Sequence, residues 1–224
     1  MSTRHLHLHS ATGLSKKQKY LRVGIVQIAV FMLEVVGWVF SGSVTLLGDA
    51  CHVAFDALAS WVGFIAVGSA ERHKDLRVAH RIEAKGTKVN GFLLIVAALF
   101  LTITIIYHNS GVHEVNGVWA LASLAVGLAA NFFCVRIYGH THDDDLMASA
   151  RVHVLLDILS SFIAVVSTLL VALTGFAKFD LFFSIPLVFL FAGVGLWFIH
   201  RAYARLRKMQ MDDAAEEEHG GGAA

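Results

Sequence analysis

The chain has 224 residues, of which 56% are hydrophobic, with a mean hydropathy of +0.64 and a single proline. These values are typical of a protein whose solvent is lipid rather than water. The formal net charge of +1 excludes a strongly basic nucleic-acid-binding protein. The two cysteines, Cys51 and Cys134, lie in apolar segments without CxxC spacing, so neither a disulfide framework nor a thiolate zinc site is supported.

Six stretches of the chain are long and apolar enough to cross a membrane, which takes about 20 residues of helix. In chain order they are residues 22–40, 44–69, 89–107, 117–138, 146–173 and 180–200. The preceding segment, residues 1–20, lacks the apolar core and cleavage site of a signal peptide, so we expect it to be retained. The sequence therefore predicts an all-α membrane protein, with a six-helix transmembrane domain at residues 21–202 and a short tail at residues 203–224.

Lysine and arginine are distributed very unevenly along this topology. They lie in the amino-terminal segment, in the loop before residue 89, at the edges of the loop before residue 146 and in the tail, and only Lys178 falls on the opposite side. Short cytoplasmic loops of membrane proteins carry an excess of these residues. We therefore expect both termini in the cytoplasm, and a structural ion pair between Arg81 and Glu83 where the third span begins.

The first two spans contain ionisable residues, each of which costs about 2.5–3.5 kcal/mol at the centre of an inserted helix. The first holds Glu34, and the second holds Asp49, His52 and Asp56. His52 and Asp56 are four residues apart, so both side chains project from the same helical face, which Asp49 shares. A polar face inside a membrane is a functional hypothesis by default.

The third and fourth spans carry only neutral polar groups, but the fifth repeats the pattern of the second. In the stretch HVLLD, His153 and Asp157 have the same separation as His52 and Asp56. If the two faces meet, two nitrogens and two oxygens converge, a donor set that suits a tetrahedral divalent ion and zinc above all. One such pair alone is equally consistent with a hydrogen bond that holds helices together. Its recurrence favours a metal site, because each buried carboxylate adds a desolvation penalty.

These motifs resemble those of the cation diffusion facilitator family, six-helix zinc transporters that exchange cytosolic metal for protons. The stretch SGSVTLLGDACHVAFDALAS at residues 41–60 resembles the family's helix-two motif, and LMASARVHVLLDILSSFIAVVS at residues 146–167 its helix-five motif. The supporting matches are FMLEVVG at 31–37, HRIEAKGTKVNG at 80–91 and GLAAN at 127–131. The resemblance covers about residues 20–205.

The resemblance implies a set of roles for the residues in these motifs. It makes His52, Asp56, His153 and Asp157 the metal ligands, and it places Asp49 beside them as an outer carboxylate or proton relay. The expected function is zinc/proton antiport that exports zinc by alternating access, not enzymatic catalysis. Cadmium and cobalt accept similar ligands, so the ion stays open.

The resemblance also sets expectations for partners and location. The expected partners are divalent ions, protons and the lipid bilayer, and no nucleic acid is expected. Membrane helices could provide the interface of a homodimer. The short loops and the absence of a targeting segment favour a bacterial inner membrane, with an organelle membrane of a eukaryote as the alternative. Family members usually continue into a cytosolic metal-binding domain after the sixth helix. Because the sequence ends about 24 residues after His200, we expect a member without that domain.

Two histidine-bearing segments are candidates for metal capture at the cytosolic mouth. The loop GHTHDDD supplies His140, His142, Asp143, Asp144 and Asp145. It is equally well explained as a solvated acidic turn at a helix start, where negative charge is favourable. The amino-terminal stretch HLHLH, which holds His5, His7 and His9, is better explained as a disordered tail.

Two other classes of protein would also place histidines inside a membrane. A membrane cytochrome could use His52 and His153 as axial haem ligands, but Asp56 and Asp157 would then have no role. An intramembrane protease is the third class, but the sequence has no HExxH or GxSxG motif and no evident nucleophile beside its histidines.

Overall fold

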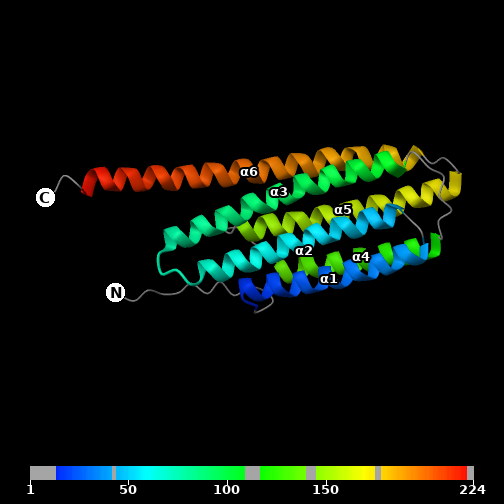
Figure 1. The fold of residues 1–224 in the computed structure, drawn as a ribbon, viewed down its shortest axis with the longest axis horizontal. Helices are drawn as coiled ribbons and strands as arrows, with labels where there is room; N and C mark the ends of the chain where they lie inside the picture. The colour runs from blue at the N-terminus through cyan, green and yellow to red at the C-terminus, as the bar shows by residue number, and fades with distance from the viewer. Residues whose placement is uncertain (1–13, 42–43, 109–116, 140–144, 175–177, 221–224) are drawn as a thin grey trace.

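A computed structural model describes residues 14–41, 44–108, 117–139, 145–174 and 178–220, and all regular secondary structure within them is helical. Figure 1 shows the helices side by side along one long axis. They are α1 (Lys16–Ser41), α2 (Val44–Ala70), α3 (Leu76–His108), α4 (Gly117–Tyr138), α5 (Asp145–Thr174) and α6 (Lys178–Gly220). All six contain a stretch long and apolar enough to cross a membrane. The predicted fold class, an all-α protein with six spans, is therefore confirmed.

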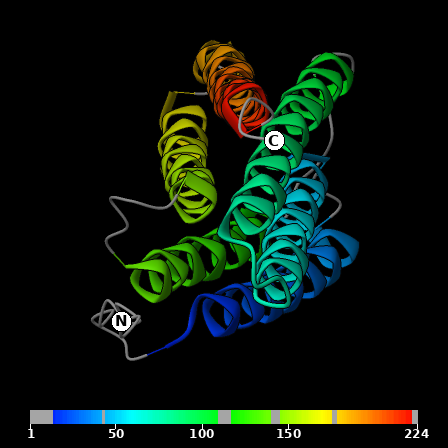
Figure 2. The same ribbon diagram turned by 90° about the vertical axis from the view of Figure 1, so that its left-hand side faces the viewer.

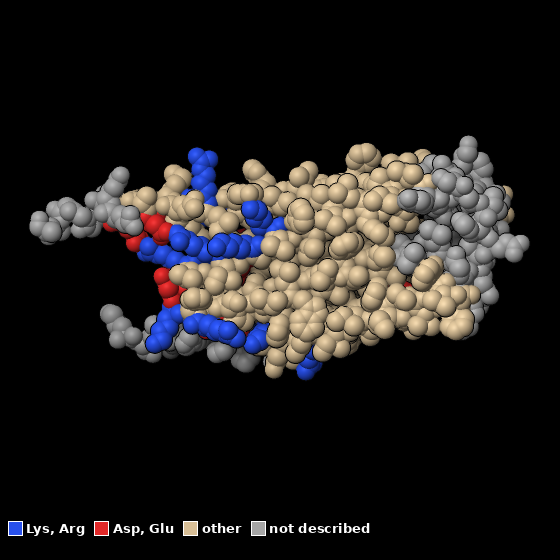
Figure 3. All heavy atoms as spheres, in the orientation of Figure 1, with Lys and Arg blue, Asp and Glu red and all other residues tan. Residues whose placement is uncertain are grey.

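Consecutive helices run in opposite directions along the bundle (Figure 1). The start of α1 and the end of α6 consequently lie at the same end of the molecule. Lysine, arginine and acidic residues gather at this end, whereas the middle of the visible face carries other residues (Figure 3). We call it the charged end. Its cytoplasmic orientation stays a prediction.

Two helices extend well beyond their predicted spans. α3 begins at Leu76 rather than at residue 89, and α6 continues to Gly220 rather than ending near residue 200. The predicted loop and tail are thus largely helical at the charged end, where α6 projects beyond the other helices (Figure 1). Hydropathy marks only the part of a helix that suits lipid. It does not register a charged helix that continues into water.

The most extensive helix pairs are α3 with α6 and α1 with α2. α3 and α6 approach through two glycines, because a Cβ built on Gly91 would lie 2.7 Å from the Gly195 carbonyl oxygen, and the reverse distance is also 2.7 Å. In the α1–α2 pair the Tyr20 ring fills the space beside Gly63. Small residues at helix interfaces allow this close approach in membrane proteins.

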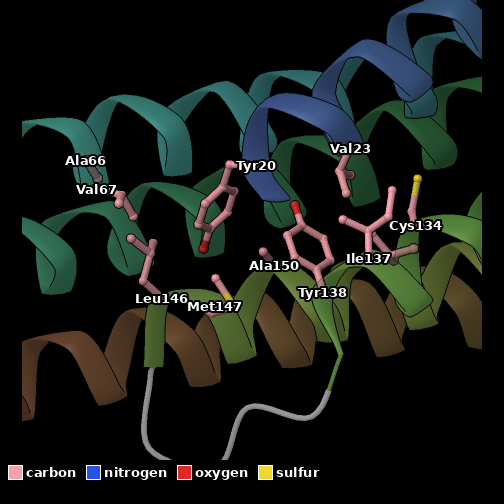
Figure 4. Close-up of a cluster of buried hydrophobic side chains, with 11 residues drawn as sticks. Tyr20, Val23, Ala66, Val67, Cys134, Ile137, Tyr138, Leu146, Met147 and Ala150 are labelled. Carbon is pink, nitrogen blue, oxygen red and sulfur yellow. The ribbon is translucent and has the colours of Figure 1, made fainter. Parts of the chain in front are cut away.

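Two clusters of buried apolar side chains hold the bundle together, and α5 contributes to both. The first joins α1, α2, α4 and α5, and contains Tyr20 and Tyr138 in edge-to-face contact, with ring centroids 5.5 Å apart (Figure 4). Cys134 lies in it as a small buried residue. The second cluster consists of Leu94, Ala98, Leu156, Leu187, Phe191 and Phe198 from α3, α5 and α6. Viewed along the bundle, α1 and α4 lie on one side and α6 on the other (Figure 2).

Candidate metal centre

The helices α2 and α5 bring the two histidine-aspartate pairs face to face. His52 Nε2 lies 3.0 Å from Asp157 Oδ1, and His153 Nε2 lies 2.8 Å from Asp56 Oδ1. Within α2, His52 Nε2 is 3.9 Å from Asp56 Oδ2. Each imidazole is therefore closer to the aspartate of the opposite helix than to the partner one turn away on its own helix. The sequence predicted that the two faces could meet, but not this crossed arrangement.

Three of these four side chains are almost completely buried. Asp56, His153 and Asp157 are 1–2% exposed, whereas the His52 side chain is 14% exposed. Both carboxylate oxygens of Asp56, both ring nitrogens of His153 and Oδ2 of Asp157 make no hydrogen bond with any described residue. The 2.8 Å approach of His153 to Asp56 is thus close but not aligned as a hydrogen bond. Buried polar atoms are nearly always paired in native proteins, so these atoms require a further partner.

A cation fits this set of atoms. His52, Asp56 and Asp157 each offer one ligand atom, and these atoms all lie within 4.8 Å of one another. His153 adjoins them through Asp56, with its ring centroid 6.4 Å from that of His52. Two imidazole nitrogens and two carboxylate oxygens form a donor set that zinc accepts in tetrahedral geometry. The negative charge of two buried carboxylates is also compensated by a divalent ion.

An aromatic ring from α6 also contacts the cluster. The Phe191 ring lies 4.8 Å from the His52 ring, centroid to centroid, at an interplanar angle of 75°. Sequence reasoning missed Phe191 because it is one of 16 phenylalanines in an apolar chain. Neither its type nor its spacing in α6 signals a neighbour on α2.

A hydrogen-bonded network lies one helical turn from Asp56. The Ser60 hydroxyl donates to Gln27 Oε1 over 2.6 Å and lies 3.2 Å from the Tyr138 hydroxyl. Lys19 Nζ in turn donates to the Tyr138 carbonyl over 2.9 Å, at the end of α4. These contacts link α1, α2 and α4. They support the helix that carries His52 and Asp56.

The remaining predicted site residues are placed only in part. Asp145 starts α5 and accepts ion pairs of 2.6 Å from Arg201 and Arg205, so its carboxylate is engaged by α6. Asp49 belongs to α2, but its side chain lies outside the described part of the chain. The other loop residues, His140, His142, Asp143 and Asp144, and the histidines at positions 5, 7 and 9 also lie outside it. Metal capture by these residues stays a prediction.

Comparisons with known proteins find similarity to transporters of metal ions. A family model described as the cation efflux transmembrane domain matches residues 21–206. The zinc transporter ZitB of Pectobacterium atrosepticum is 32% identical over 187 residues, which cover 81% of this chain and 58% of the relative. ZitB of Escherichia coli is 28% identical over 189 residues, which cover 81% of this chain and 60% of the relative.

A third relative is named for several ions. The cadmium, cobalt and zinc/H(+)-K(+) antiporter of Bacillus velezensis is 29% identical over 181 residues, which cover 78% of this chain and 58% of the relative. The chain thus spans about three-fifths of the length of these relatives. All three are named as transporters, which agrees with the prediction that the chain is not an enzyme, and six apolar helices indicate a multi-pass integral membrane protein. Because the family model covers more than half of the chain, the protein belongs to the cation efflux family, the cation diffusion facilitators.

Proposed function

We propose that the protein exports zinc from the cytoplasm in exchange for protons. The observation that carries this proposal is a cluster in which His52, Asp56 and Asp157 bring ligand atoms within 4.8 Å of one another inside the bundle. His153 adjoins this cluster, with its Nε2 atom 2.8 Å from Asp56 Oδ1. The buried atoms of Asp56, His153 and Asp157 that make no hydrogen bond with a described residue need a cation. A buried carboxylate is also too costly to serve packing alone. We assign the four residues as the ligands of the transported ion.

The donor set favours zinc over harder or softer ions. Magnesium prefers six oxygen ligands and retains water, whereas copper(I) prefers thiolates and thioethers. Cys134 is buried in the first apolar cluster, outside the four proposed ligands. Two imidazoles with two carboxylates suit zinc, and cadmium and cobalt are the competitors that the names of the relatives also suggest.

Proton exchange follows from the contacts of the ligand atoms. Zinc binds deprotonated ligands, so loading releases protons and protonation favours release. His52 Nε2 and Asp157 Oδ1, 3.0 Å apart, can share a proton when no ion is bound. The proton and the ion therefore compete for the same atoms. Zinc affinity should fall as the pH is lowered through the neutral range, where histidine titrates.

The depth of the site requires alternating access. Asp157 lies 12 residues after Asp145, the first residue of α5. At 1.5 Å per residue this is about 18 Å along α5 from its first residue, comparable with half of a membrane core of roughly 30 Å. We place the charged end in the cytoplasm by its lysine and arginine content. Since the ligands are almost fully buried, the helices must move to admit and release the ion.

The cellular setting belongs to the same proposal. The relatives come from bacteria, and we place the protein in the inner membrane with residues 1–20 and 203–224 on the cytoplasmic side. Pairing of two copies through membrane helices stays a prediction. A haem between His52 and His153 is disfavoured, because a carboxylate oxygen lies beside each Nε2 atom where iron would bind.

A flux experiment tests the proposal directly. The purified full chain is reconstituted in liposomes that contain a zinc indicator and a pH indicator, and a proton gradient is imposed. We expect zinc and protons to move in opposite directions, and zinc flux to fall to the liposome background in Asp157→Ala. Asp212→Ala, which removes an exposed carboxylate of α6, should retain wild-type flux. Full transport by Asp157→Ala would overturn the ligand assignment, and zinc flux without proton movement would overturn antiport.

A further inference from the structure

We propose that Phe191 is a positioning residue for metal binding. Its ring holds the His52 imidazole in the orientation that binds the ion together with Asp56 and Asp157. This inference rests on the proposed function, because it concerns the same site. It adds α6 to the helices that determine metal affinity and selectivity.

The Phe191 and His52 rings have a favourable relative geometry, and the packing around Phe191 holds its ring in place. Their centroids are 4.8 Å apart and their planes are inclined by 75°, within the range in which aromatic pairs attract each other edge to face. Phe191 is 1% exposed and is packed in the second apolar cluster with Leu94 and Leu187. A phenylalanine held in this way cannot easily follow a rotation of His52. It therefore restrains the imidazole rather than moving with it.

His52 is the candidate ligand that most needs such a restraint. Its side chain is 14% exposed, whereas those of Asp56, His153 and Asp157 are 1–3% exposed and are confined by packing. The Nε2 atom of His52 faces Asp157, so that contact must be exchanged when the nitrogen binds an ion. The Phe191 contact is made with the ring and leaves Nε2 free to exchange partners. It can orient His52 both before and after the ion binds.

The contact also connects helices that are not main packing partners. α6 packs chiefly along α3 and then α5, whereas His52 is carried by α2. Through Phe191, the α3–α6 pair touches the metal centre from a helix that provides none of the four proposed ligands. A shift of α6 relative to α2 would change the support of His52. Ion binding and the position of α6 are then physically linked.

Loss of the Phe191 ring should lower the affinity for zinc and reduce the selectivity for zinc over cadmium. Residues that orient metal ligands typically change affinity by about 10–100-fold when they are replaced. We expect Phe191→Leu to reduce zinc affinity by about tenfold or more. The ratio of zinc to cadmium affinity should also fall, because a less constrained imidazole enforces tetrahedral geometry around the smaller ion less strictly. A purely structural role for Phe191 would not change this ratio.

The experiment measures affinity on the purified full chain in detergent, by competition with a chromogenic zinc chelator and then with cadmium. Phe189→Leu is the matched control, since Phe189 lies on the same helix but is 72% exposed. It should stay within about twofold of the wild type. Phe191→Met, which retains more volume, is the second variant. Thermal unfolding without metal checks that each variant is folded.

A double-mutant cycle separates action through His52 from general packing. His52→Asp keeps a ligand oxygen but removes the ring, so Phe191→Leu should change zinc affinity by less than about twofold in that background. An equal loss in both backgrounds would overturn the inference, as would wild-type affinity and selectivity in Phe191→Leu. Absence of zinc binding by the wild type would instead overturn the proposed function, and this inference with it.

Discussion

The metal centre and the charged end use the same side-chain chemistry in opposite environments. In the centre, His153 lies 2.8 Å from Asp56, and both are almost fully buried. At the charged end, Arg77 pairs with Glu216 over 2.6 Å, but these side chains are 54% and 63% exposed. The distances are similar, so they do not distinguish the two regions. Burial does, because it decides what each pairing costs.

Exposed ion pairs gain little, since water and salt screen them and long side chains lose freedom. Buried carboxylates incur a desolvation penalty of several kcal/mol that a neighbouring imidazole offsets only in part. The ion pairs between α3 and α6 at the charged end therefore need little desolvation and contribute little to the free energy of unfolding. The metal centre reduces the stability of the empty protein, and that reduction is tolerable where binding an ion compensates for it. Each region can be tested by removing one carboxylate.

The largest effect is expected from Asp56→Asn in the metal centre. The substitution keeps the shape of the side chain but removes a buried negative charge, so zinc transport should fall at least 100-fold. The chelator-treated protein should nevertheless melt at the wild-type temperature or above it, because the uncompensated carboxylate is gone. Zinc flux in liposomes and thermal unfolding in chelator measure the two effects. A variant that loses both transport and several degrees of stability would show that Asp56 is chiefly structural.

An intermediate effect is expected where α3 and α6 pack together, between the two regions. Gly195→Ala would place a Cβ 2.7 Å from the Gly91 carbonyl oxygen, so the helices must separate. Overpacking of this kind costs about 1–3 kcal/mol of unfolding free energy. Gly193→Ala, on the same helix, meets no atom within 4 Å and is the matched control. Denaturant titration should show destabilisation for Gly195→Ala alone, and equal stability of both variants would contradict the close packing.

The sequence predicted those features that depend on local periodicity. The ends of α2, α4 and α5 lie within one residue of the predicted spans, since apolar residues continue to the helix ends there. Helical spacing also identified both histidine-aspartate pairs. The extensions of α3 and α6 were missed because they are rich in charged residues, which hydropathy does not mark as part of a span. Ion pairs between the two helices, rather than lipid, stabilise these residues.

Contacts between residues far apart in the chain could not be predicted from the sequence. The predicted ion pair between Arg81 and Glu83 is wrong: Arg81 pairs with Asp213 on α6, and Glu83 pairs with Lys16 on α1. Residues two apart on a helix point in different directions, so Arg81 and Glu83 each pair with a residue of a different helix. The crossed arrangement of the metal centre and the contact of Phe191 with His52 were missed for the same reason.

The smallest effect is expected at the charged end, from Asp213→Asn. Asp213 accepts ion pairs from both Arg77 and Arg81, so this one change weakens the joint between the α3 and α6 extensions. Its side chain is nevertheless 31% exposed, and the melting temperature should fall by no more than about 3 °C. Screening predicts that even this difference disappears in 1 M salt. Zinc flux should equal that of the wild type. Thermal unfolding of Asp213→Asn and Asp56→Asn at low and high salt compares the two regions directly. If Asp213→Asn abolished transport while its stability was unchanged, the charged end would be part of the transport cycle, and burial alone would no longer separate the two regions.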